Sequence, residues 1–379
     1  KYFNYVWSYE IDTLGYFQPP LDTDGYYHVY IIDLANSGIY GQTTWGTSPI
    51  NTGQPPRYTT YIQIDKDFST VYPPTRGIPA LKVTAAHEFN HAIHIGSYGL
   101  WVNDFYFYEL TATWMETVVF NDVKDYIQYL YQFDPNTNRN VAAGQFATPD
   151  VSFNAYSGLI EFSRGIWGCY VQKRFSRDVI RRAWELMQTF LNNAAPSIPA
   201  MDAALSEYGS SLRQAFLEWS VWNLHTGPDA DTVKYYPDGR LYPFMQQRAD
   251  VVYNGEYRSF ADTIQALSSV YHPICILDSL HPTCNTSPKI DAIISNLNAD
   301  AAGDGIGYGF QYDISPTGDQ TYKPLGNGVF VKISASDPAN WSSQEIETDS
   351  GSLIVPRYTE PLVCPDPFRP SGNKLLSFR

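Results

Sequence analysis

Residues 79–96 read PALKVTAAHEFNHAIHIG, and this stretch decides how the centre of the chain is expected to fold. Pro79 suits the first turn of a helix, where its missing N–H leaves no hydrogen bond unmade. The residues after it recur at three- and four-residue steps, the spacing of one helix face: Ala80, Val83, Thr84, His87, His91 and His94. Gly96 ends this pattern, as glycine commonly does after a helix. The stretch therefore predicts a helix that begins at Pro79 and ends at Gly96.

Within this predicted helix lies the pattern His87-Glu88-Phe89-Asn90-His91, or HExxH. Two histidines four residues apart project from one helix face and can place their ring nitrogens on one Zn²⁺. Glu88 then reaches the water beside the metal as a general base. The competing interpretation is a helix with two ordinary surface or core histidines. The helical setting is the one that the motif requires, and it favours a zinc site.

A catalytic zinc ion needs a third protein ligand besides His87 and His91. His94 lies on the same face but nearly one turn beyond His91, so a straight helix hardly brings all three histidines round one ion. Glu109 and Glu116 lie in a second predicted helix, seven residues apart and therefore on about the same face. Either carboxylate can complete a site of two histidines and one glutamate.

The spacing of these residues resembles that of the gluzincin zinc peptidases, in which a glutamate opens the second helix at about this distance after HExxH. A denser match is to a family of secreted multidomain bacterial proteins identified as metalloproteases by the motifs TAAHEFxHAIQ and ExTATWME. This chain reads TAAHEFNHAIH at 84–94 and ELTATWME at 109–116. The resemblance implies a zincin-like fold and zinc peptidase activity.

By this resemblance the zinc ligands are His87, His91 and Glu109. We then expect Glu116 behind them, hydrogen-bonded to a ligand histidine or to nearby backbone. His94 stands where the family has glutamine, which adds an imidazole near the metal.

The implied reaction is hydrolysis of a protein or peptide substrate, in which Glu88 takes a proton from water and passes it to the leaving amine. In the resembled group a tyrosine or histidine from a later helix stabilises the oxyanion. Tyr156 in NAYSGLIEF is our choice for this catalytic role, and His225 in WNLHTG is the rival. Ordinary packing is the competing interpretation for both. The alternative function is a structural or adhesive surface protein that keeps the fold without turnover.

The patterning over the 379 residues predicts an α+β protein of two domains. Residues 1–235 are expected to form the zincin-like metallopeptidase domain, with strands at Tyr26–Asp33 and Tyr58–Asp65 and then a helical bundle. The further helices are expected at Glu109–Phe120, Val123–Phe133, Tyr156–Phe175, Asp178–Leu191 and Ser211–Leu224.

Residues 236–379 are expected to form an all-β, sandwich-like accessory domain. Its strands are expected at Asp250–Phe260, Val270–Leu277, Ala292–Leu297, Gly307–Tyr312 and Val329–Ser334. Within residues 361–379, the sequence VCPDPFRP resembles the opening of a further sorting or Ig-like module.

Charge and composition exclude several classes of function. The chain has 25 basic and 39 acidic side chains, a net charge of -14, which is the wrong sign for binding nucleic acid or anionic lipid. No apolar stretch approaches the length of a membrane span. The 30 Tyr and 9 Trp among many turn residues favour a secreted or cell-surface protein.

Weaker signals concern calcium and the cysteines. Asp22-Thr23-Asp24-Gly25 is a fragment of a calcium-loop pattern without its final glutamate, so a solvated turn is favoured over a Ca²⁺ site. The glycine-rich residues 303–309 are expected to form a loop that could touch Ca²⁺. Cys275 and Cys284 can pair across a hairpin, whereas Cys169 is expected to be a buried thiol.

Overall fold

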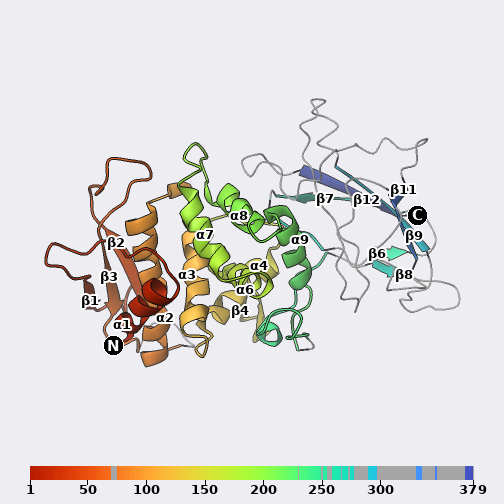
Figure 1. The fold of residues 1–379 in the computed structure, drawn as a ribbon. Helices are drawn as coiled ribbons and strands as arrows, with labels where there is room; N and C mark the ends of the chain where they lie inside the picture. Colours follow the sequence, from red (N-terminus) through yellow and green to blue (C-terminus); the bar gives the residue numbers. More distant parts are fainter. Residues whose placement is uncertain are drawn as a thin grey trace. The chain divides into compact units, whose positions relative to one another are not determined.

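The computed structural model describes residues 1–69, 75–228, 230–248, 251–253, 258–265, 267–271, 274–276, 289–296, 330–334, 346–347 and 372–378 (Figure 1). The chain forms two compact units. The first consists of Lys1–Gln145, Asn154–Leu212 and Thr226–Pro243, and the second of Phe146–Phe153, Arg213–His225 and Phe244–Arg379. Helices and small sheets occur together, which confirms the α+β class at this level.

This division differs from the predicted boundary after residue 235. The segment Thr226–Pro243 belongs to the first unit, where the Tyr126 hydroxyl donates a hydrogen bond to Oδ2 of Asp238 at 2.8 Å. Helix α9 (Leu212–Trp222) falls almost entirely in the second unit, although its helical pattern suggested the first domain. The point at which the sequence changes from helical to strand-like patterning therefore does not coincide with the boundary between the two compact units.

Three short strands form the sheet of the first unit: β1 (Val29–Ile32), β2 (Gly41–Trp45) and β3 (Thr60–Asp65). The order is β1-β3-β2, with β1 parallel and β2 antiparallel to β3. The sequence predicted β1 and β3 but not β2. Strand β2 reads GQTTW, and none of its side chains is fully buried, so it lacks the apolar alternation that marks a strand.

The N-terminus is helical, although no helix was predicted there. Helix α1 (Tyr2–Trp7) is followed directly by a π-helix, Ser8–Thr13. Val6, Glu10 and Leu14 are buried, and their four-residue spacing is that of one helix face. The charged residue in the middle of this face concealed the apolar period. Oε2 of Glu10 accepts a hydrogen bond from Nδ2 of Asn90 at 3.0 Å.

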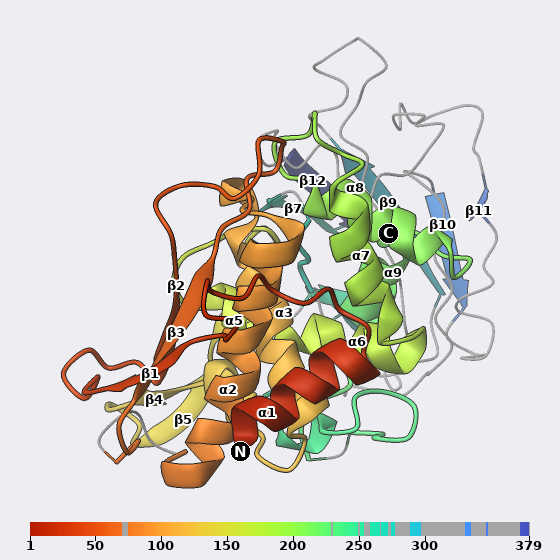
Figure 2. The same cartoon turned by 60° about the vertical axis from the view of Figure 1, so that its left-hand side comes forward.

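Helix α2 (Gly77–Ile93) lies between this sheet and α3 (Phe105–Val119), as Figures 1 and 2 show. Every residue of α2 from Val83 to Ile93 is buried, because the helix is covered on all sides. The helix predicted from Pro79 to Gly96 is thus confirmed, and its last turn widens into a π-helix at His94–Tyr98.

The other helices are short. They are α4 (Gly144–Ala147), α5 (Ile160–Ser163), α6 (Gly165–Arg174), α7 (Asp178–Met187) and α8 (Ser197–Ser206), with 3-10 turns at Val102–Asp104 and Gly239–Leu241. The helix expected at Val123–Phe133 is wrong. That segment forms a 3-10 helix, Asp125–Leu130, and then β4 (Tyr131–Asp134), which pairs antiparallel with β5 (Arg139–Ala142).

Helices α6 and α3 pack closely because Gly168 has no side chain. A Cβ atom at Gly168 would overlap Cγ of Trp114, which is itself buried in α3. We expect Gly168→Ala to lower the free energy of unfolding by about 1–3 kcal/mol through overpacking. This outcome opposes helix propensity, which favours alanine. Denaturant unfolding of the two proteins measures the difference, and a more stable variant would contradict this account of the helix contact.

The second unit carries the strands of the C-terminal region. They are β6 (Val251–Tyr253), β7 (Arg258–Ile264), β8 (Ile274–Ile276), β9 (Lys289–Asn296), β10 (Phe330–Ser334), β11 (Ile346–Glu347) and β12 (Gly372–Phe378). Five of them form an antiparallel sheet in the order β11-β10-β9-β12-β7, and β6 pairs with β8 in parallel. A two-sheet sandwich stays a prediction.

Strand β12 lies within residues 361–379, where the start of a further module was expected, and that expectation stays a prediction. The strand lies between β9 and β7 in the five-stranded sheet, so residues 372–378 belong to this sheet. The strand expected at Gly307–Tyr312, the glycine-rich residues 303–309 and Cys284 lie outside the described residues. Cys169 is a free, partly buried thiol.

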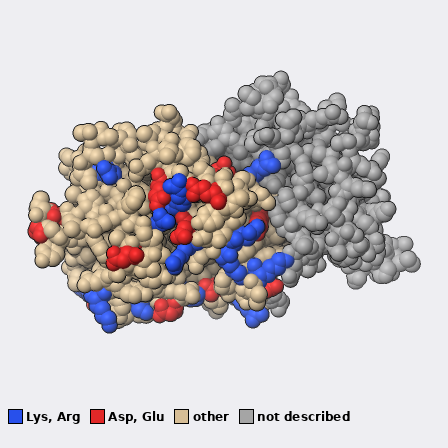
Figure 3. Space-filling view, in the orientation of Figure 1, with Lys and Arg blue, Asp and Glu red and all other residues tan. Residues whose placement is uncertain are grey.

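The described part of the chain contains no helix that is both long and apolar enough to span a membrane. On the face drawn in Figure 3, basic side chains stand next to acidic ones. Arg182 forms ion pairs with both Glu185 and Glu207.

Candidate metal centre

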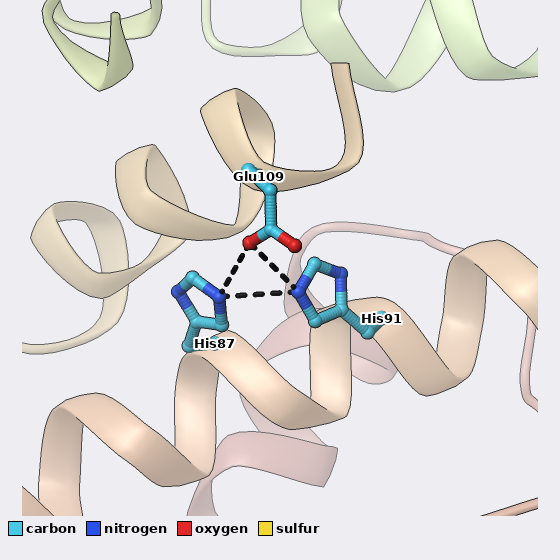
Figure 4. Close-up of side chains that lie close together, drawn as sticks. All are labelled: His87, His91 and Glu109. Atoms are coloured by element: carbon cyan, nitrogen blue, oxygen red, sulfur yellow. Dashed lines mark hydrogen bonds and ion pairs between the residues drawn. The ribbon is translucent and has the colours of Figure 1, made fainter. Parts of the chain in front are cut away.

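Three side chains from α2 and α3 converge on one point (Figure 4). Nε2 of His87 lies 3.1 Å from Nε2 of His91. Oε2 of Glu109 lies 3.2 Å from the first of these nitrogens and 3.3 Å from the second. Bonds of about 2.0–2.1 Å in a tetrahedral zinc site place neighbouring ligand atoms about 3.3–3.4 Å apart. The spacing and the donor set, two imidazoles and one carboxylate, both fit a zinc ion with an open fourth position.

The connection between the two helices is held by Tyr108, the neighbour of Glu109. Its hydroxyl accepts a hydrogen bond from the backbone N–H of Trp101 at 3.0 Å and donates one to the carbonyl of Gly99. Gly99 has φ +100°, and a Cβ there would meet the ring of Pro55. The start of α3, and with it Glu109, is thereby fixed against the end of α2.

Glu116 lies behind the converging atoms, as the sequence led us to expect. Its Oε1 is 2.8 Å from Nδ1 of His87. A carboxylate in this position fixes the ring so that Nε2 faces the ion. Burial raises the pKa of Glu116 to about 7, against the lowering influence of His87.

The charges of the site compensate one another. Burial works against a charge on His87, but its bonds to Glu109 and Glu116 prevail and raise its pKa well above the usual value. Burial likewise opposes ionisation of Glu109, but the adjacent His91 and His87 prevail and lower its pKa.

We expect Glu116→Gln to weaken zinc binding by about 10- to 100-fold, the usual cost of losing a partner of a ligand histidine. The amide keeps the size of the side chain but is a weaker partner for Nδ1 of His87 than a carboxylate is. Competition with a chromogenic chelator measures the affinity, with Glu207→Gln on the surface as the matched control. Equal affinity in the two variants would show that Glu116 does not support the ligand.

Glu88 lies on the side of α2 that faces the sheet. Its Oε2 accepts a hydrogen bond from the Thr43 hydroxyl of β2 at 2.7 Å. The side chain is buried, with 7% of the residue exposed. The general base expected from the motif is thus adjacent in sequence to the ligand His87 and is held by a polar contact of its own.

Tyr156 is exposed in a loop before α5 and is not part of the converging group. Glu161 anchors this loop by accepting hydrogen bonds from the backbone N–H groups of Ser157 at 3.0 Å and Gly158 at 2.6 Å. Partial burial raises the pKa of Tyr156, and the charges of Glu109 and Glu161 add to this rise. The oxyanion role of Tyr156 stays a prediction.

The two remaining histidine candidates lie elsewhere. His94 is fully buried and stacks on Trp184 with ring centroids 3.9 Å apart. Neither of its ring nitrogens has a hydrogen-bond partner among the described residues, and burial lowers its pKa well below the usual value. It is a neutral packing residue and not a ligand in this arrangement. His225 belongs to the second unit, and its role as oxyanion donor stays untested.

Sequence reasoning missed several residues around the site. Thr43 lies in the strand that was not predicted. Phe162 stacks on the ring of His87 at 6.0 Å, and Tyr129 stacks on Phe162 at 4.9 Å. Aromatic residues are so common in this chain that no sequence signal distinguished these two.

The calcium-like fragment forms a turn. The backbone N–H groups of Thr23 and Tyr26 donate to carboxylate oxygens of Asp22 and Asp24, and His28 lies within 3.4 Å of both carboxylates. Among the described residues, one group of possible metal ligands has atoms close enough together to hold an ion, and it consists of His87, His91 and Glu109. Ca²⁺ binding has no support from this turn.

Comparison of the chain with protein-family models, with curated proteins and with solved structures finds no match in any of the three. The resemblance to gluzincins therefore rests on the motifs alone.

Proposed function

We propose that this protein is a zinc-dependent hydrolase of peptide bonds. The observation that carries the proposal is the convergence of His87, His91 and Glu109 within 3.1–3.3 Å of one another, with Glu88 next to the first ligand. Packing alone does not require two histidines and a buried carboxylate to meet at one point, because unpaired buried charge is costly.

A zinc ion bound there would polarise a carbonyl group and acidify a water molecule. Glu88 takes the proton of the attacking water and delivers it to the leaving amine. Glu116 keeps His87 oriented while this happens. Tyr156 is proposed to approach the developing oxyanion from its anchored loop.

A peptide is the substrate class that the surroundings favour. Strand β2 is an edge strand of the three-stranded sheet, and its residue Thr43 contacts Glu88. An extended peptide that pairs with β2 would therefore run beside the general base. A small polar substrate would gain nothing from such an edge.

The proposal is tested by hydrolysis of casein and of a fluorogenic peptide library by the full chain. We expect activity with about one zinc per chain, loss of activity with a chelator and recovery on adding zinc. A zinc-loaded, folded protein that hydrolyses none of these substrates would favour the alternative of a structural or adhesive protein. An extracellular location is part of the proposal and rests on composition; recovery of the protein from the cell interior of its source would oppose it.

A further inference from the structure

Strand β2 and helix α2 approach each other closely at Gly41. A Cβ atom at this position would lie 2.7 Å from Cγ2 of Thr84 and 3.2 Å from Cγ of Glu88. The first distance is too short for any real side chain, so glycine permits the approach. Thr43 is two residues further along the strand and therefore faces the same helix.

The Thr43 hydroxyl reaches Glu88 in two ways. Its oxygen lies 2.7 Å from Oε2 of the carboxylate and 2.8 Å from the backbone carbonyl oxygen of the same residue. A hydroxyl has one proton to donate. Donation to an ionised carboxylate is the stronger of the two bonds, because it is assisted by charge. The carbonyl oxygen of Glu88 is the second acceptor within reach of this hydroxyl.

The two oxygens of the Glu88 carboxylate therefore differ. Oε2 is bound to Thr43, whereas Oε1 has no hydrogen-bond partner among the residues that the structure describes. One oxygen is tied to the sheet and the other is left for the proton of a water molecule. A freely rotating carboxylate would lose this distinction.

We propose that Thr43 is the positioning residue of the general base: its hydroxyl fixes the orientation of the Glu88 carboxylate, and Gly41 makes the contact possible. This inference rests on the proposed function, since it assigns Glu88 the role of base. In this assignment Thr43 touches Oε2 of Glu88 and not Oε1, the oxygen that takes the proton.

The test compares three variants of the full-length protein. Thr43→Val keeps the shape but removes the hydroxyl, and Thr43→Ser keeps the hydroxyl. Thr44→Val is the matched control, because adjacent residues of a strand point to opposite faces. With Thr43→Val we expect kcat to fall by about 10-fold or more, the effect of losing a hydrogen bond to a charged group, with KM and zinc content nearly unchanged. Thr43→Ser should restore most of kcat, and Thr44→Val should leave it unchanged.

Crystal structures of the variants supply a readout that does not need activity. The Glu88 carboxylate should keep its orientation in Thr43→Ser and change it in Thr43→Val. An unchanged carboxylate in Thr43→Val overturns the inference, as does an unchanged kcat. If the unaltered protein binds zinc but hydrolyses no peptide, the proposed function fails, while the orientation of Glu88 still decides whether Thr43 positions it.

Melting curves of the variants and the Glu88→Gln background supply two further tests. Loss of zinc and of the melting transition in Thr43→Val but not in Thr44→Val would assign Thr43 to stability and overturn the inference. Where both variants fold, Thr43→Val should add no further loss of kcat to Glu88→Gln, because the group to be positioned is already gone. Additive losses would also overturn it.

Discussion

Glu88→Gln is expected to reduce peptide hydrolysis by at least about 10²-fold, the usual contribution of a general base. The amide has the size of the carboxylate and can still accept a hydrogen bond from Thr43, but it cannot take a proton from water. Zinc content and melting temperature should therefore stay close to those of the unaltered protein. Steady-state kinetics on the best peptide substrate measure the effect.

The matched control for this variant is Glu207→Gln, which makes the same chemical change at an exposed ion pair with Arg182. It should leave hydrolysis unchanged. Full activity in Glu88→Gln would contradict the assignment of Glu88 as the general base, whatever the metal content of the variant.

His91→Ala is expected to abolish zinc binding at micromolar zinc concentrations. It deletes one of three converging donors, and the loss should exceed the about 10- to 100-fold effect of a supporting residue such as Glu116. Zinc at 100 times its dissociation constant should stabilise the unaltered protein by about 2.7 kcal/mol, because the unfolded chain lacks the assembled site. This stabilisation should vanish in the variant.

Thermal unfolding with and without zinc, combined with metal analysis after dialysis, checks this expectation. His28→Ala is the control, since His28 contacts Asp22 and Asp24 away from the converging group. A zinc-dependent rise in melting temperature that survives in His91→Ala but disappears in His28→Ala would place the metal at the N-terminal turn.

The centre of the fold and the metal group could be predicted because they depend on local spacing. The residues of α2 repeat at helical steps, and histidines four apart must share a face. Glu109 could be reached only through a family resemblance, because nothing local distinguishes it from Glu116. The structure distinguishes the two glutamates. Glu109 lies against the Nε2 atoms of His87 and His91, whereas Glu116 lies against Nδ1 of His87.

Other features could not be predicted because they depend on contacts distant in sequence. Glu10 is buried and bonded to Asn90, eighty residues away, so an acidic residue stands on the buried face of the N-terminal helix where a pattern search expects an apolar one. Strand β2 has no apolar alternation and is held by pairing with β3 and by the close approach at Gly41. The division into units differs from the predicted boundary in the same way, since the segment Thr226–Pro243 belongs to the first unit.

The most direct test of the account is a crystal structure of the zinc-loaded full-length protein with anomalous data collected at the zinc edge. We predict one strong anomalous peak within about 2.0–2.2 Å of Nε2 of His87, Nε2 of His91 and a carboxylate oxygen of Glu109. A peak at another group of side chains, or a zinc-free site with Glu109 turned away from the two histidines, would contradict it.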